Sequence, residues 1–458
     1  MERIIGCDPD RKMPCYTKQD GVDYIPLPTW KVFLIQFLNI AGLGPIFGAI
    51  MGIMFGPSAF LWIVFGTILA GAVHDFLSGV ISIRKDGASL PEIVGAELGT
   101  GIKQLMRGFS LLLMMLVGAV FVLTPSGLIA GMTPEWMDTK FWIAVIFIYY
   151  MLATVLPIDK LIGNIYPLFG FALLFMAVGI MGVLIFGDVT IPDGLTDGLY
   201  NRSAMADTQP LFPMMFVSIA CGAISGFHAT QSPMMARCLK NEKLARPIFY
   251  GAMVAEGIVA LIWAAAAIAF AGGYSELDTY LAENGGAGGL VHNISISWLG
   301  TFGGILAIIG VIAAPITTGD TALRSARLIA ADFLGFDQSK IVKRILLSLP
   351  IFAVTYTIMQ TDFNILWRYF AWCNQTLAMF TLWAITVYLA RNGKMYAATL
   401  LPAMFMTCVC ITYILFAPEG LGLDYTLSVG IGIILACLLC AWFLKSIAFT
   451  RQITTTEE

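Results

Sequence analysis

The sequence predicts an all-α polytopic membrane protein with about twelve transmembrane helices, two of them interrupted near their middle. Three observations lead to this fold class. The composition is too apolar for a water-soluble domain, long apolar segments recur along the chain, and glycine-rich stretches interrupt the first and the sixth of these segments. Together they favour a helical bundle around a polar site at membrane depth.

The composition supports the membrane assignment without any motif. Hydrophobic residues make up 58 % of the 458 residues, charged residues 12 %, and the mean hydropathy is +0.83. Soluble domains carry about 25 % charged residues. The net charge of −3 indicates no nucleic-acid partner. Cys7 and Cys15 could pair or bind a metal, but two cysteines without a histidine favour ordinary thiols, so we expect no metal or cofactor.

The apolar segments predict twelve spans, because a bilayer core about 30 Å thick needs about 20 apolar residues per helix. The predicted spans are Trp30–Phe55, Ser58–Ile83, Met106–Ala130, Phe141–Leu156, Ile165–Phe186, Leu211–Met235, Pro247–Ala271, Trp298–Ile316 with a polar helical continuation, Ile345–Met359, Ile365–Leu389, Tyr396–Phe416 and Tyr425–Leu444.

The loop charges predict the orientation. With a cytoplasmic N-terminus, the loops assigned to the cytoplasm collect most of the lysines and arginines, whereas the outer loops hold little beyond Lys140 and Arg202. This is the positive-inside pattern. An even number of spans then places both termini in the cytoplasm.

The interruptions read Asn39–Pro45 in the first span and Cys221–Ala229 in the sixth. In lipid, an unwound turn leaves peptide groups unpaired unless it lines a protein-enclosed cavity. Two breaks at corresponding positions predict the LeuT-type plan of secondary transporters, although glycines in membrane helices can also simply permit close packing. The expected units are a cytoplasmic segment 1–28, a five-helix repeat 29–186, an inverted repeat 210–391, two added helices 395–446 and a cytoplasmic tail 447–458.

A carboxylate-bearing substrate is expected at the breaks, where the half-helices begin with free N–H groups and the positive end of the helix dipole. His228 would add charge or titrate near neutral pH, or else satisfy freed carbonyls. The amides of the tenth span would face the same cavity or act as polar contacts between helices. The candidate substrate-binding residues are Gly42, Gly44, Pro45, Gly226, Phe227, His228, Asn374 and Gln375.

The coupling ion is expected at polar residues buried in the spans, since a charge at the bilayer centre costs about 2.5–3.5 kcal/mol. His74 and Asp75 are adjacent, about 100° apart on a helix, so we expect them to reach different partners; Asp75 could instead pair with Arg84. Glu256 is the only acid deep in the seventh span.

The eighth span adds Thr317 and Thr318, whose hydroxyls would suit a sodium ion beside the first break. Asp320 could carry a proton or pair with Arg324 four residues later. These residues leave the choice between H⁺ and Na⁺ open.

Other function classes are disfavoured. A channel would need a continuous polar stripe or a charged ring through several spans. With three histidines and no zinc-type spacing, nothing indicates an enzyme. A membrane nutrient sensor without transport remains the alternative to a carrier, and the oligomeric state is open.

Several motifs resemble the carbon starvation protein A (CstA) family of bacterial peptide and pyruvate transporters. They are Asp20–Pro26, Ile40–Pro45, Leu69–Phe76, Ser82–Leu90, Ile219–Ala229, Asn241-Glu242, Asp320 with Arg324 and Arg327, and Asn374-Gln375. They run in order from about residue 8 to the end of the tenth span.

The resemblance implies uptake of short peptides or pyruvate across the bacterial cytoplasmic membrane, driven by a cation gradient, with the proton favoured over sodium. The chain also departs from the family. It is a short form, it has Ile35-Gln36 where many relatives have a His-His pair, and it has His74 where many have glutamine. A proton or substrate role of the family's histidines therefore need not lie at the same positions in this chain.

Overall fold

The computed structural model describes residues 2–21, 23–154, 158–192, 198–338 and 340–456. Within these ranges the chain is helical, with turns and loops between the helices and no strand. The α-helices are α1 (Glu2–Ile5), α2 (Pro14–Thr17), α3 (Thr29–Ala41), α4 (Ala49–Ile53), α5 (Ser58–Gly66), α6 (Ala72–Arg84), α7 (Leu90–Leu98), α8 (Thr100–Ala130), α9 (Thr139–Ala153), α10 (Ile158–Phe186), α11 (Leu211–Ser218), α12 (Ala220–Ala223), α13 (Gly226–Ala236), α14 (Gly251–Ala271), α15 (Tyr274–Glu283), α16 (Gly286–Leu334), α17 (Ile341–Ile358), α18 (Phe363–Arg391), α19 (Ala397–Phe416) and α20 (Tyr425–Thr456). Three π-helical turns, η1 (Gly44–Gly48), η2 (Thr67–Gly71) and η4 (Arg246–Tyr250), and the 3₁₀ turn η3 (Glu242–Leu244) complete the order.

The all-helical polytopic membrane fold is confirmed, but the number of spans is not. In the described part of the chain, eight helices are long and apolar enough to cross a membrane, or nine when one bent pair is counted as a span. Each predicted span coincides with a helix or a broken helix, yet α9 has only 15 residues and the sixth span is in short pieces. Positions 155–156, at the end of the fourth predicted span, lie outside the described residues. The count of twelve therefore stays a prediction.

The first predicted interruption is present between α3 and η1. Helix α3 ends at Ala41, and Gly42 follows with φ 44° and ψ −131°, a conformation that only glycine adopts without strain. The two halves, Thr29–Ala41 and Gly44–Ile53, are bent by 50°. The N–H of Gly42 still donates to the carbonyl of Leu38 at 3.5 Å, and the first half of the span ends there.

The second interruption is also present. Helix α12 ends at Ala223, the next two residues, Ile224 and Ser225, are extended, and α13 begins at Gly226. Thr67 of η2 donates a hydrogen bond from Oγ1 to the carbonyl of Gly222 at 3.0 Å, so one peptide oxygen released by the break has a partner on the second span.

The two breaks lie against each other. A Cβ on Gly44 would lie 2.0 Å from the Cβ of Cys221, which is an impossible contact, so the backbone of η1 approaches α12 as closely as a glycine allows. Both interruptions therefore share one place in the interior of the bundle, as expected for a substrate-binding transporter core.

The N-terminal segment lies across one end of the bundle. Arg11 and Arg84 both contact Glu242, with Nε to carboxylate-oxygen distances of 2.8 Å each. Further along, the carboxylate of Asp23 lies 3.6 Å from a guanidinium nitrogen of Arg324 and 3.9 Å from one of Arg327. These ion pairs connect the segment to α6, η3 and α16.

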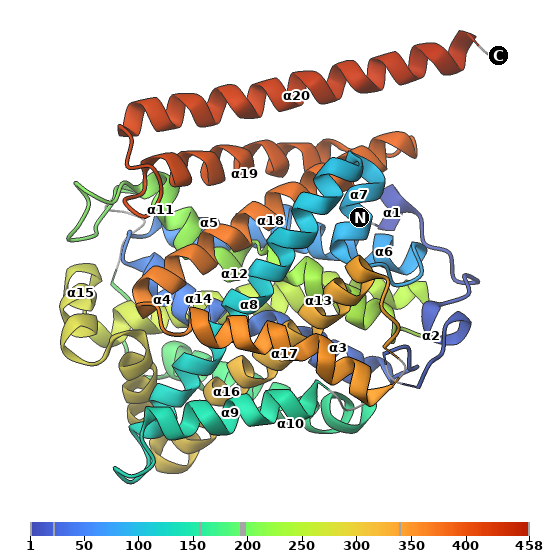
Figure 1. The fold of residues 1–458 in the computed structure, drawn as a ribbon. Helices are drawn as coiled ribbons and strands as arrows, with labels where there is room; N and C mark the ends of the chain where they lie inside the picture. The colour runs from blue at the N-terminus through green and yellow to red at the C-terminus, as the bar shows by residue number, and fades with distance from the viewer. Residues whose placement is uncertain (1, 22, 155–157, 193–197, 339, 457–458) are drawn as a thin grey trace.

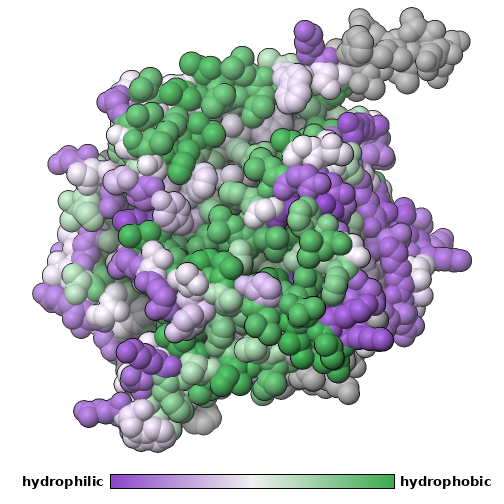
Figure 2. Space-filling view, in the orientation of Figure 1, coloured by the Kyte–Doolittle hydropathy of each residue, from purple (hydrophilic) through white to green (hydrophobic). Residues whose placement is uncertain are grey.

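Figures 1 and 2 show how the bundle is arranged. The long helices run across the view, and the N-terminal segment and the end of α20 lie at the same side, on the right. Helices α19 and α20 pack against each other at the top, outside the rest of the bundle. The middle of the surface is largely hydrophobic, whereas hydrophilic residues gather over the N-terminal segment (Figure 2). This distribution fits a helical bundle whose apolar surface contacts the lipid of a membrane.

Candidate functional site

Two histidines and two carboxylates from three spans meet beside the second break. His228, the third residue of α13, places Nδ1 2.9 Å from Oδ2 of Asp75 on α6. Its Nε2 lies 3.4 Å from Oε2 of Glu256 on α14. The second oxygen of Asp75 lies 2.8 Å from Nδ1 of His74. All four side chains are fully buried. The structure therefore brings together four of the predicted residues, which are far apart in the sequence.

The contact within the His74–Asp75 pair corrects the expectation that the two side chains reach different partners. They leave the helix about 100° apart, but Nδ1 of an imidazole and the oxygens of an aspartate lie close to the backbone. Both side chains can therefore turn toward the same side and meet. The alternative pairing of Asp75 with Arg84 is also wrong, because Asp75 faces the two histidines and Arg84 contacts Glu242 at the end of α6.

The cluster can hold one movable proton. With Nδ1 of His228 donating to Asp75, a neutral imidazole leaves Nε2 as an acceptor facing Glu256. The proton between them is then on Glu256 when the imidazole is neutral, or on Nε2 when the imidazole is charged. The net charge of the three groups is the same in both states. The gap of 3.4 Å is longer than a strong hydrogen bond, so a small movement of α13 would change the contact.

Close contact between the second span and the end of α12 sets the position of this cluster. Helix α6 follows the π-helical turn η2, and a Cβ on Gly71 would lie 2.2 Å from the carbonyl oxygen of Ala223. The second span therefore touches the backbone at the end of α12. Because Gly71 permits this approach, Asp75 one turn later can reach His228 across the break.

The tenth span holds the start of α13. Oδ1 of Asn374 accepts hydrogen bonds from the backbone N–H of Phe227 at 2.7 Å and from the hydroxyl of Ser225 at 2.9 Å. Gln375 donates to the carbonyl of Phe216 at 3.3 Å. A Cβ on Gly226 would lie 2.3 Å from the backbone nitrogen of Ala378. Both amides thus make contacts between helices, and their role in substrate binding stays a prediction.

Of the two hydroxyls that the sequence predicts beside the first break, that of Thr318 lies there. Thr318 donates from Oγ1 to the carbonyl of Leu38 at 3.0 Å, and this hydroxyl would lie 3.4 Å from a Cβ on Gly42. Thr317 donates to carbonyl oxygens of its own helix, at Ala313 and Ala314. Pro45 has no N–H, so the start of η1 offers one donor fewer than a half-helix without proline would offer to a substrate carboxylate.

Asp320, the third predicted residue on α16, is fully buried. The guanidinium of Arg324, four residues later, lies 3.6 Å from Asp23 of the N-terminal segment. The pairing of Asp320 with Arg324 stays a prediction.

The fold has a counterpart among solved structures. The crystal structure of MhsT in complex with L-phenylalanine matches with a TM-score of 0.56, covering 89 % of this chain and 98 % of that one, at 14 % identity. At this identity the match supports the LeuT-like fold alone.

The sequence comparison is more specific. The model of the carbon starvation protein CstA family matches residues 1–135 and 131–286, which is more than half of the chain. This chain belongs to the CstA family. It is therefore a multi-pass membrane transporter and not an enzyme, and the resemblance inferred from the motifs is confirmed.

Relatives within the CstA family fall into two groups. An uncharacterized membrane protein of Haemophilus influenzae is 43 % identical over 317 residues, covering 59 % of this chain and 85 % of that protein. The pyruvate/proton symporter BtsT of Escherichia coli is 31 % identical over 340 residues, with 61 % and 47 % coverage. The peptide transporter CstA of Escherichia coli is 28 % identical over 321 residues, with 57 % and 46 % coverage. The chain spans about half the length of these two named transporters.

Two buried amides beside the first break were absent from the predicted site. Gln36 and Asn39 lie three residues apart on α3, are fully buried, and make no hydrogen bond through any of their four amide atoms within the described residues. Buried polar groups in native structures are almost always paired with protein, water or ligand. Their spacing of one turn in the apolar part of α3 is visible in the sequence, where Gln36 stands out as a departure from the family.

Proposed function

We propose that this chain imports a small carboxylate-bearing nutrient, a short peptide or pyruvate, by alternating access coupled to a cation gradient, with the proton favoured over sodium. The setting is the bacterial cytoplasmic membrane with both termini in the cytoplasm, and the repeats are 29–186 and 210–391. The observation that carries the proposal is the buried chain of contacts from Asp75 through His228 to Glu256. The names of BtsT and of the CstA peptide transporters agree with the substrate classes.

Proton coupling follows from where His228 lies. It belongs to the half-helix that begins at the break, while its two carboxylate partners belong to neighbouring spans. Movement of the half-helix would lengthen or shorten the contact with Glu256, and the shared proton would then stay on one partner or the other. A conformational change at the break is thereby linked to proton release, because a buried unpaired charge is costly.

Sodium is the second candidate ion, supported by the hydroxyl of Thr318 beside the Leu38 carbonyl. This pair of oxygens is a partial ligand set, since sodium, like other hard cations, prefers oxygen ligands in larger number. The proton cluster has more of its parts in contact, and we therefore favour the proton.

The substrate would lie beside the first break and contact Gln36 and Asn39. Each primary amide presents a donor and an acceptor, and leaving them unpaired in the interior costs about 1–3 kcal/mol per group. A peptide offers N–H donors as well as carbonyl and carboxylate acceptors. Pyruvate at neutral pH offers acceptors alone, so it would leave the oxygens of Gln36 and Asn39 to water. The amides thus favour a peptide over pyruvate.

The test is uptake of labelled pyruvate and of a labelled dipeptide into proteoliposomes, under a proton gradient and separately under a sodium gradient. We expect accumulation with the proton gradient, and His228→Ala should abolish it. His292→Ala is the matched control, because His292 is an exposed histidine outside the cluster. Normal proton-driven uptake by His228→Ala would refute the role of the cluster. Substrate binding without accumulation under either gradient would indicate a nutrient sensor instead of a carrier.

A further inference from the structure

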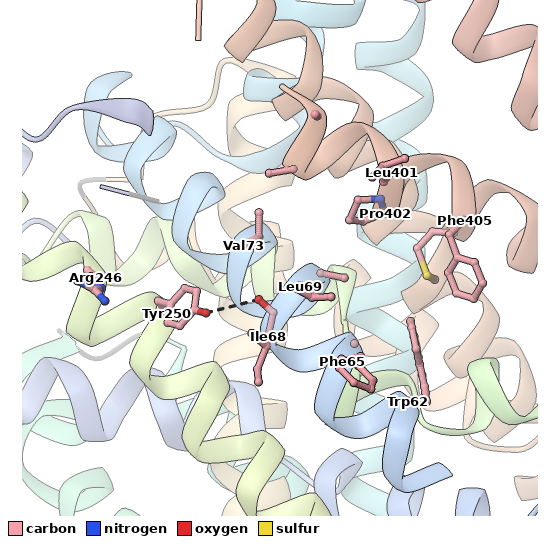
Figure 3. A pocket seen from close by; sticks show the side chains of 15 residues that line it. Trp62, Phe65, Ile68, Leu69, Val73, Arg246, Tyr250, Leu401, Pro402 and Phe405 are labelled. Carbon is pink, nitrogen blue, oxygen red and sulfur yellow. Dashed lines mark hydrogen bonds between the residues drawn. The ribbon is translucent and has the colours of Figure 1, made fainter. Parts of the chain in front are cut away.

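An apolar groove runs along the outside of the bundle. It has a volume of about 600 Å³ and is formed by side chains of the second span, of the π-helical turn η4 and of α19. Figure 3 shows Trp62, Phe65 and Leu69 on one wall and Leu401 and Phe405 on the other.

The groove opens toward the bilayer. Phe65, Leu69 and Leu401 on its walls are 57 %, 59 % and 69 % exposed, and they belong to helices long and apolar enough to cross a membrane. Large apolar side chains exposed at this depth contact lipid chains in a membrane protein. Lipid is therefore the molecule with direct access to the groove.

The dimensions fit one leaflet. The wall of the second span extends from Trp62 to Val73, eleven residues apart. At about 1.5 Å per residue this wall is about 16 Å long. The hydrocarbon core of a bilayer is about 30 Å thick, so the groove covers about half of it. An acyl chain from one leaflet matches that length.

One end of the groove is polar and basic. Arg246 and Tyr250, both from η4, lie together at this end (Figure 3). Arg246 is exposed, and Lys394, also exposed, precedes the groove residue Ala397 by three positions. The Tyr250 hydroxyl lies 3.5 Å from the carbonyl of Ile68. This is the side of the N-terminal segment, since Asn241, shortly before η4, donates to the carbonyl of Pro9 at 2.9 Å.

From the apolar walls, the length and the basic end, we propose that this groove is a binding site for an anionic phospholipid of the leaflet on the side of the N-terminal segment. One acyl chain lies along Trp62, Leu69 and Leu401, and the phosphate lies against the guanidinium of Arg246. Guanidinium groups bind phosphate oxygens through two parallel N–H donors, and anionic lipids are attracted to basic residues at the membrane surface.

The site is adjacent to the transport machinery. Its floor is η2, the π-helical turn that precedes the helix of His74 and Asp75, and its end is η4, which precedes the helix of Glu256. π-helical turns are frequent at functional sites. A lipid in the groove therefore contacts α19 on one side and, on the other, the π-helical turns that lead into two of the three helices of the cluster.

The experiment uses the full chain in vesicles and does not depend on transport, so its failure is separate from a failure of the proposed function. Trp62 fluorescence is quenched by lipids carrying bromine on the acyl chain, and the difference between the chain and Trp62→Phe isolates the Trp62 signal. Vesicles of phosphatidylcholine would contain a small fraction of either brominated phosphatidylglycerol or brominated phosphatidylcholine. We expect about fivefold more effective quenching by the anionic lipid.

Arg246→Gln should make Trp62 quenching by the two brominated lipids equal. Lys340→Gln, which neutralises an exposed base at the start of α17, should leave the preference for the anionic lipid unchanged. Ala398→Phe, which narrows the groove from the wall of α19, should reduce Trp62 quenching by both lipids. Equal quenching of the unmodified chain by both lipids, or a preference that survives Arg246→Gln, would overturn the proposal. If Arg246→Gln does not fold, the Ala398→Phe result and the lipid preference of the unmodified chain still decide it.

Discussion

Replacing Glu256 by glutamine should abolish proton-driven accumulation while leaving substrate exchange intact. The glutamine side chain has nearly the same shape, so it fits the buried site on α14. Its amide can donate to Nε2 of His228, which is the acceptor when Nδ1 donates to Asp75. The variant should therefore fold, but it can no longer take up or release the shared proton.

The magnitude follows from the number of movable protons. In the proposed relay one proton moves between Glu256 and His228, whose Oε2 and Nε2 lie 3.4 Å apart, so one proton per substrate is expected. A difference of one pH unit is worth about 1.36 kcal/mol per proton, which supports at most about tenfold accumulation of a substrate whose transport moves no other charge. Glu256→Gln should lower this ratio to about one. Two coupled protons would instead allow about a hundredfold.

The assay compares two modes in the same proteoliposomes. Accumulation is measured with a pH difference across the membrane, and exchange is measured by loading unlabelled substrate inside and following entry of labelled substrate without a gradient. Glu283→Gln, at the end of α15, is the control for loss of an acid outside the cluster. Proton-driven accumulation by Glu256→Gln at the level of the unmodified chain would refute the relay.

Three further predictions concern the packing of the breaks and the N-terminal segment. Gly44→Ala should lower the free energy of unfolding by about 1–3 kcal/mol, because its Cβ would overlap the Cβ of Cys221, and Cys221→Gly should restore part of the loss in heat denaturation in detergent. Asn374→Ala should lower the free energy of unfolding by about 1–3 kcal/mol, because it leaves the Phe227 N–H without its acceptor. The control Asn392→Ala, just beyond the same helix, should lower it little. Equal effects of the two variants in heat denaturation would contradict this account. Burial raises the pKa of the Cys15 thiol to about 11, so maleimide labelling of Cys15 at pH 8 should be slow. Glu242→Gln weakens the contact of Arg11 with Glu242 and should speed this labelling, measured by mass spectrometry of the Cys15 peptide, by up to about a hundredfold. An unchanged labelling rate would show that the N-terminal segment stays bound.

The breaks could be predicted because glycine marks each of them in the sequence. Gly42 needs a left-handed conformation and Gly226 needs close contact with another backbone, and both requirements select glycine at that position of the sequence. The CstA resemblance was equally accessible, since motifs are strings of neighbouring residues. By contrast, the span count depends on how short or bent helices such as α9 and α11 lie in the bilayer, which hydropathy does not measure.

The partners of the buried polar residues were not predictable in the same way. Arg84 was a reasonable partner for Asp75 because both lie on one helix. In the structure, Arg84 instead contacts Glu242, which is 158 positions away along the chain. For Asn374 the sequence left substrate binding and contact between helices open, and the structure shows its oxygen accepting from the first turn of α13. Gln36 and Asn39 stand one turn apart in the sequence, but only the structure shows that both are buried and that their amide atoms have no hydrogen-bond partner among the described residues.

The sequence by itself determined that this is a helical membrane protein of the CstA family with two interrupted spans, because apolar runs, glycine positions and motifs are properties of adjacent residues. The tertiary structure alone decided that His74, Asp75, His228 and Glu256 form one cluster and that the Thr318 hydroxyl donates to the carbonyl of Leu38. The physical reason is that a buried charge or amide is stabilised by whichever group lies within hydrogen-bond distance in space. That group is set by the packing of helices that are distant in the chain.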